Sequence, residues 1–115
     1  MATAWFRWGV ALTLLAVSAC GGGGDEADPV ARGRAAYLAN CVACHATNPK
    51  LAGPIGPEVA GSSRELIAAK VMRNTYPPGY APKRATRAMA PLPHLEPKLE
   101  DLASYLGGLS PASIP

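Results

Sequence analysis

Large aromatic side chains are scarce in this 115-residue sequence. Trp5, Phe6 and Trp8 lie within the first 19 residues, so residues 20–115 contain neither tryptophan nor phenylalanine. The same part of the chain holds all 12 prolines. A domain this small and this rich in loops buries little apolar surface, so its own core gives it only marginal stability.

Strand patterns and basic blocks are also missing. No stretch alternates apolar and polar residues in the way that predicts a half-buried β-strand, and no segment repeats. From residue 20 onward, ten Lys and Arg stand against eight Asp and Glu, and no run of basic residues is longer than two. The sequence therefore argues against a β-sheet fold, and we expect no nucleic-acid partner.

The first 19 residues predict a signal peptide. Arg7 is followed by a short apolar run over residues 9–17. This run is too short to cross a bilayer, which needs about 20 apolar residues. A basic residue ahead of such a run is typical of a secretory signal peptide, and residues 20–115 then hold one small domain.

Cys20 lies at the predicted cleavage point. The stretch Val17-Ser18-Ala19-Cys20 resembles a bacterial lipobox, and this resemblance implies that Cys20 becomes the first residue and carries acyl chains. The alternative is an ordinary signal peptide with a cysteine at the junction, which would leave an unpaired thiol in an oxidising compartment. The glycine-rich, acidic residues that follow predict a flexible tether over residues 20–28.

The most informative motif is Cys41-Val42-Ala43-Cys44-His45, which has the spacing of a c-type haem attachment site. Two thiols at this spacing lie on one turn of backbone, and each can form a thioether with one haem vinyl group. His45 then lies under the porphyrin, where an imidazole nitrogen can bind the iron. We therefore expect one covalent haem c, which would also supply the apolar bulk that the domain lacks.

Other interpretations of a C-x-x-C pair are a thiol redox couple, a small disulfide and half of a zinc site. A redox couple is expected beside a βαβ pattern, which this sequence lacks. A zinc site would need Cys41, Cys44 and His45 together with His94, the only other histidine. Because Cys44 and His45 are neighbours, their side chains diverge from a common metal. Haem is the favoured interpretation, and zinc and a disulfide stay as alternatives.

Helical patterns cover residues 29–40, 64–76 and 96–106. Each begins with a capping or first-turn residue, or ends at a residue that stops a helix. These signals are Asp28-Pro29, Ser62 or Ser63, Pro77-Pro78-Gly79, Glu96-Pro97 and Gly107-Gly108. The segments between them are rich in Gly and Pro, so we predict an all-α fold with irregular loops.

Over roughly residues 28–109 the chain resembles a small bacterial class I cytochrome c, here tethered as a lipoprotein. The motifs that carry the resemblance are Gly33-x-x-x-Tyr37, Cys41-x-x-Cys44-His45, Gly53-Pro54, Met89-x-Pro91 and Leu102-Ala103-Ser104-Tyr105-Leu106. The resemblance implies three main helices around one haem, in a domain over residues 29–115. It also implies that Gly33 lets the first and last helices cross closely, with Tyr37 and Tyr105 packing across the contact.

The sixth iron ligand is expected to be Met89. It lies in a loop stiffened by prolines, which can hold a weak thioether on iron, and it matches the methionine loop of the family. Met72 lies within a predicted helix, where methionine more often fills the core. His94 would give a bis-histidine site, but it is expected to flank the last helix or lie on the surface.

The family resemblance further implies that a proline carbonyl accepts the second ring N–H of His45 and so fixes its tautomer. We expect Pro54 to supply this carbonyl, because Gly53-Pro54 follows the histidine by a few residues. Gly56-Pro57 repeats the pattern and is the alternative, and a simple tight turn is a third interpretation.

These features together predict an electron carrier. Histidine and methionine stay bound in both oxidation states, so little rearranges, and the thioether raises the reduction potential. The expected partners are redox proteins (a dehydrogenase, a bc1-type complex or a terminal oxidase) on the periplasmic side of a bacterial membrane, where a lipid anchor keeps the domain near them. The alternative is a five-coordinate haem enzyme, or a gas or peroxide sensor, with a labile Met89.

Overall fold

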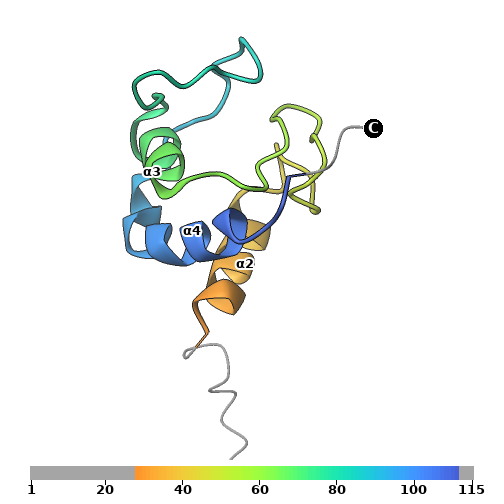
Figure 1. Ribbon diagram of the computed structural model, residues 1–115, viewed down its shortest axis with the longest axis vertical. Coiled ribbons are helices and arrows are strands. Elements are labelled where there is room, and N and C mark those ends of the chain that lie inside the picture. The colour runs from red at the N-terminus through yellow and green to blue at the C-terminus, as the bar shows by residue number, and fades with distance from the viewer. Residues whose placement is uncertain (1–27, 112–115) are drawn as a thin grey trace, which may run out of the picture.

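The computed structural model describes residues 28–111. Within this part of the chain the regular elements are all helical: α2 (Pro29–Asn40), α3 (Arg64–Arg73), the 3-10 helix η1 (Pro93–Lys98) and α4 (Leu99–Gly107). Figure 1 shows α4 running across α2, with α3 and the long loops above α4. This arrangement confirms the all-α prediction. The predicted signal peptide (1–19), Cys20 and the tether up to residue 27 lie outside the described residues.

α2 begins where the sequence predicts. Asp28 is extended and its side chain accepts a hydrogen bond from the Val30 N–H at 2.9 Å, while Pro29 occupies the first turn. The helix ends at Asn40, and the N–H of its C-cap residue, Cys41, donates to the Tyr37 carbonyl at 2.9 Å. α2 therefore delivers the chain directly to the Cys41–His45 motif.

α3 ends at Arg73 rather than at the predicted Tyr76. Its start is capped as expected, since Ser63 Oγ accepts a hydrogen bond from the Leu66 N–H at 3.2 Å. It stops because Asn74 adopts the left-handed conformation (φ 50°, ψ 43°), a helix-ending geometry that asparagine tolerates better than most residues. The proline pair at 77–78 therefore follows the helix end and does not cause it.

The last α-helix starts later than predicted. Residues Pro93–Lys98 form the 3-10 helix η1, and α4 begins at Leu99. Pro97, which has no N–H to donate to a preceding turn, lies inside η1 and therefore ahead of α4. The end of α4 at Gly107 agrees with the predicted end to within one residue.

α2 and α4 touch backbone to backbone. A Cβ placed on Gly33 would lie 1.9 Å from the Asp101 carbonyl oxygen, a distance that no side-chain carbon reaches. Beside this contact the rings of Tyr37 and Tyr105 pack with centroids 5.8 Å apart and an interplanar angle of 57°. The predicted close crossing at Gly33, with two tyrosines packed across it, is confirmed.

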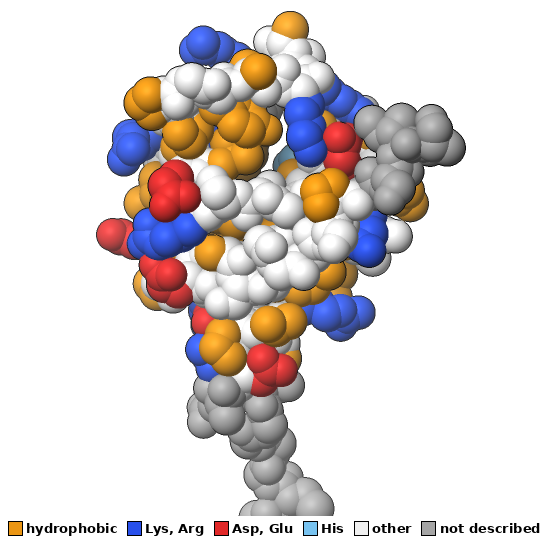
Figure 2. All heavy atoms as spheres, viewed as in Figure 1, with side chains coloured by type: hydrophobic (Ala, Val, Ile, Leu, Met, Phe, Trp, Pro, Cys, Tyr) orange, Lys and Arg blue, Asp and Glu red, His pale blue; other side chains and the backbone are white. Residues whose placement is uncertain are grey.

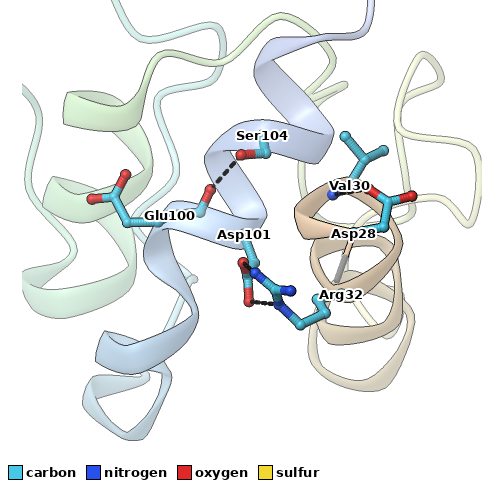
Figure 3. A network of polar contacts seen from close by, with 6 residues as sticks. All are labelled: Asp28, Val30, Arg32, Glu100, Asp101 and Ser104. Atoms are coloured by element: carbon cyan, nitrogen blue, oxygen red, sulfur yellow. Dashed lines mark hydrogen bonds and ion pairs between the residues drawn. The ribbon is translucent and has the colours of Figure 1, made fainter. Parts of the chain in front are cut away.

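An ion pair fastens the same two helices. Figure 3 shows Arg32 reaching from α2 to Asp101 in α4, where Nε donates to Oδ2 at 3.0 Å and Nη2 donates to Oδ1 at 2.8 Å. Asp101 is the one charged residue among the described residues that is buried. Its hydrogen bonds from Arg32 lower the pKa of the Asp101 carboxyl. The two-point geometry fixes the orientation of one helix on the other.

The core lies between the helices and is small. Its most buried large side chains are Tyr37 and Leu102, each 1% exposed. The full cluster of buried residues is Ala36, Tyr37, Ile67, Val71, Leu95, Leu99, Leu102 and Leu106. Several of them, including Ile67 and Leu106, also line a pocket, so one side of this core is completed by whatever fills that pocket. Among residues 28–111, no helix has both the length and the apolar character needed to cross a membrane.

Candidate haem site

A mostly apolar pocket opens between α3, α4 and two long loops. These are the His45 loop (residues 41–63) and the Met89 loop (residues 74–92). Its cavity has a volume of about 260 Å³. Figure 2 shows the hollow, with hydrophobic side chains on one wall and Lys, Arg and acidic side chains on the other. The apolar lining comes from Ile55, Val59, Leu66, Ile67, Val71, Ala88, Ala90, Leu92, Leu102 and Leu106. Such a pocket suits a flat, apolar ligand.

The Cys41–His45 motif lines this pocket from the end of α2. The chain makes a tight turn there, because the N–H groups of Cys44 and His45 both donate to the Cys41 carbonyl, at 3.3 and 2.9 Å. Cys41 and Cys44 are both free, half-buried thiols. Burial, with a smaller contribution from Cys44, raises the pKa of the Cys41 thiol to about 11. The two sulfurs and the imidazole of His45 are therefore presented to one cavity by a single turn.

The carbonyl that faces the His45 ring belongs to Pro57, and the prediction of Pro54 is wrong. His45 Nδ1 lies 2.8 Å from the Pro57 oxygen. The first Gly-Pro turn packs against the backbone of the motif instead, since a Cβ on Gly53 would lie 2.3 Å from the Cys44 carbonyl oxygen. The second turn passes beside the ring itself, and a Cβ on Gly56 would lie 2.4 Å from His45 Cε1.

The Pro57 contact fixes the state of the imidazole. A carbonyl oxygen can only accept a hydrogen bond, so Nδ1 carries the proton and donates it to Pro57. The lone pair of the neutral ring is then on Nε2, which is the form in which histidine binds a metal. The Pro57 carbonyl and Gly56, which packs against the ring, together set the tautomer and the orientation of His45.

Tyr37 holds the turn from beneath, a role that the sequence did not reveal. Its hydroxyl donates to the carbonyl of Ala46, the residue after His45, at 2.5 Å. Burial, together with the nearby Cys41 and Tyr105, raises the pKa of Tyr37 to about 12. The phenol therefore stays protonated and keeps its donor. The sequence pattern predicted only the ring packing of Tyr37, because the Ala46 carbonyl carries no signal in a sequence.

Met89 lines the pocket from the loop between α3 and η1, and it is half-buried. Met72, the rival predicted ligand, packs against the core and is not part of the pocket lining. His94 is exposed in η1 and also lies outside the lining. The fold therefore brings four of the predicted haem-binding residues to one cavity: Cys41, Cys44, His45 and Met89.

Two cations join the loops on the two sides of the pocket. Arg84 Nη1 donates to the Ile55 carbonyl at 2.6 Å. Lys83 donates to the Glu58 carbonyl at 3.1 Å and lies 3.2 Å from the Glu58 carboxylate. A hydrogen bond from its own backbone and then Lys83 lower the pKa of Glu58. Sequence analysis did not anticipate this link between the Met89 loop and the His45 loop.

The donor set fits a covalent haem. It supplies two thiols on one turn, an imidazole with Nε2 available, a thioether and apolar walls. Within residues 28–111, no three His, Cys, Asp or Glu side chains come together as a metal cluster. The zinc alternative therefore has no support from the geometry, and the free thiols give none to the disulfide.

Comparison with known proteins gives the family. Searches of curated proteins and of solved structures returned no match. A family model described as cytochrome c matches residues 30–110, which is most of the chain and includes both the Cys41–His45 motif and Met89. Members of this family bind haem c covalently, carry electrons and typically work outside the cytoplasm. The chain belongs to the cytochrome c family and is a haem-binding electron-transfer protein.

Proposed function

We propose that this protein is a carrier of single electrons in which Cys41 and Cys44 would hold the haem through its vinyl groups and His45 and Met89 would bind its iron. The observation that carries the proposal is that these four residues, from two separate loops, line one apolar pocket. Bound there, the haem would supply a metal that takes up and releases one electron.

The protein's own residues would set the reduction potential of the bound haem and the reorganisation that electron transfer requires. Pro57 keeps the His45 proton on Nδ1 and so strengthens donation from Nε2. The Met89 thioether is a soft, weak donor that favours the reduced metal and raises the potential. The apolar walls from α3 and α4 would shield a haem bound there from water. Because none of these groups must move, electron transfer would need little reorganisation.

We further propose that the redox partner is acidic at its docking site. Residues 66–95 contain five Lys and Arg and no Asp or Glu, and this segment includes the whole Met89 loop. Figure 2 shows Lys and Arg side chains around the end of the molecule where the hollow opens. A dehydrogenase, a bc1-type complex or a terminal oxidase with an acidic patch would be steered to this opening, at a rate that falls with added salt.

The lipid anchor at Cys20 remains part of the proposal. The start of α2 lies at the opposite end of the described domain from the Met89 loop (Figure 1). A flexible tether attached there would keep the domain on the periplasmic side of a bacterial membrane without covering the Met89 loop. This placement suits a carrier that meets membrane-bound protein partners.

The test is the far-red absorption band that the family shows for methionine bound to ferric iron. The purified ferric protein should show the band, and Met89→Ala should abolish it, lower the reduction potential and let carbon monoxide bind the reduced protein. Met72→Ala is the matched control and should change none of these. A wild-type protein with high-spin features and no far-red band would instead favour the five-coordinate enzyme or sensor.

A further inference from the structure

The Met89 loop lacks regular secondary structure, so it must be held from outside. No residue from Thr75 to Leu92 belongs to a helix or strand. Near Met89 the loop is held at two points. The Leu92 N–H donates to the Val71 carbonyl at 2.7 Å, and the Arg87 carbonyl accepts from the Asn74 side chain at 3.2 Å. Both points belong to the C-terminal end of α3, and Met89 lies between them in sequence.

The side chain of Asn74 is aimed at the loop by its neighbours. Its Oδ1 accepts a hydrogen bond from Lys70 Nζ, one turn earlier in α3. Lys70 is itself placed over the ring of Tyr76, 4.3 Å from the centroid. With Oδ1 facing an ammonium group and Nδ2 facing a carbonyl, the amide has only one complementary orientation, because a flip would oppose donor to donor and acceptor to acceptor.

The choice of asparagine at this position is informative. Asn74 is the only non-glycine residue among the described residues with a positive φ. Glycine is the usual residue at a left-handed helix end and would satisfy the backbone at no steric cost. Glycine could not bind the Arg87 carbonyl. Asparagine ends α3 and also donates to the loop, so one residue couples the helix end to the segment that carries Met89.

We propose that Asn74 is a positioning residue that sets how firmly Met89 is held in the haem pocket. The inference rests on the proposed ligation by Met89. Val71 is in the buried core and fixes the end of α3. The Asn74 amide donates to the Arg87 carbonyl, two residues before Met89, and so ties this part of the loop to the end of α3. Without the amide, only the Leu92 contact would hold this part of the loop to α3.

The experiment measures how readily imidazole replaces Met89 in the ferric holoprotein. Asn74→Gly keeps the left-handed backbone and removes the amide, and Asn74→Asp keeps an acceptor for Lys70 and removes the donor. Both should raise the affinity for imidazole about threefold, or ~0.6 kcal/mol, the lower end for one hydrogen bond because this contact is exposed. The control is Thr75→Val, which removes a hydrogen bond of 3.3 Å to Ala69 at the same helix end and leaves the Asn74–Arg87 and Val71–Leu92 contacts intact. Its affinity for imidazole should match that of the wild type.

Unfolding separates positioning from general destabilisation. Glycine suits a positive φ, so Asn74→Gly should unfold at the same urea concentration as the wild type. An unchanged affinity of Asn74→Gly for imidazole would overturn the role of Asn74. So would a rise in affinity that Thr75→Val shows equally, or one that comes with a lower unfolding midpoint of Asn74→Gly. If the wild type lacked the far-red band, the Met89 ligand itself would be overturned, and this proposal with it.

Discussion

Residues next to the haem-binding motif decide how the His45 imidazole is held. Cys41, Cys44 and His45 were predictable, because their chemistry depends on spacing along a single turn. The partner of His45 was not, because both Gly53-Pro54 and Gly56-Pro57 had the required sequence. The choice depends on which turn packs against the backbone of Cys44 and which passes the ring, and only the folded chain decides that.

Tyr37 gives a prediction at this scale. Tyr37→Phe keeps the ring packing but removes the hydroxyl that binds the Ala46 carbonyl, so it leaves that acceptor without its partner. We expect the free energy of unfolding of the holoprotein to fall by about 1 kcal/mol, the usual cost of one hydrogen bond. Urea unfolding followed by absorbance of the haem measures it.

Tyr105→Phe is the matched control. Its ring packs on Tyr37, but within residues 28–111 its hydroxyl has no hydrogen-bond partner, so this variant should unfold at nearly the wild-type urea concentration. Equal losses in the two variants would show that the Tyr37 hydroxyl contributes nothing specific.

At the scale of the elements, the fold is organised around the close crossing of α2 and α4. Its glycine and its tyrosines were predictable from the family motifs, and the all-α class followed from the lack of any strand pattern. The positions of the helix ends were harder to predict from the sequence. Asn74 ends α3 through a backbone conformation, and a 3-10 helix that contains Pro97 takes the place of the predicted start of the last helix. Both effects depend on local hydrogen bonding that residue periodicity does not encode.

The Arg32–Asp101 pair makes the stability of this crossing depend on pH. Arg32 lowers the pKa of Asp101 in the folded state below the value of about 3.9 expected when unfolded. The stabilisation is therefore complete above that value and is lost as the pH falls through it toward the folded-state pKa. Asp101→Asn should be less stable than the wild type near neutral pH, and the difference in free energy of unfolding should shrink below about pH 4.

Glu100→Gln is the control for this prediction, because the Arg64–Glu100 ion pair is exposed and should contribute little at any pH. Urea midpoints of the variants near neutral pH and near pH ~3 give the comparison. A deficit of Asp101→Asn that stays constant across this range would contradict the ion-pair explanation.

The two ends of the described domain differ in a way that suits its proposed function. The start of α2 lies at one end of the described domain, and the Met89 loop, which lines the pocket, lies toward the other (Figure 1). The small core is open on the pocket side, as the shortage of aromatic residues predicted, so a bound haem would complete it. The charge bias of residues 66–95 can be counted in the sequence, but only the folded chain shows that Lys70, Lys83 and Arg84 line the pocket.

Anchoring is tested on the full chain produced in a bacterium that makes lipoproteins. Cys20→Ser should move the protein from the membrane fraction to the soluble periplasmic fraction, because the proposed acyl chains have no other attachment point. Haem content and the absorbance spectrum should be unchanged. Retention in the membrane fraction after this substitution would contradict lipid attachment at Cys20.

The central claim is that Cys41 and Cys44 bind one haem covalently. Intact-protein mass spectrometry after denaturation and acid-acetone extraction tests it most directly. The mature chain should carry the added mass of one haem, and Cys41→Ala together with Cys44→Ala should remove it. A wild-type chain whose mass is accounted for by its residues and acyl groups alone would contradict the account.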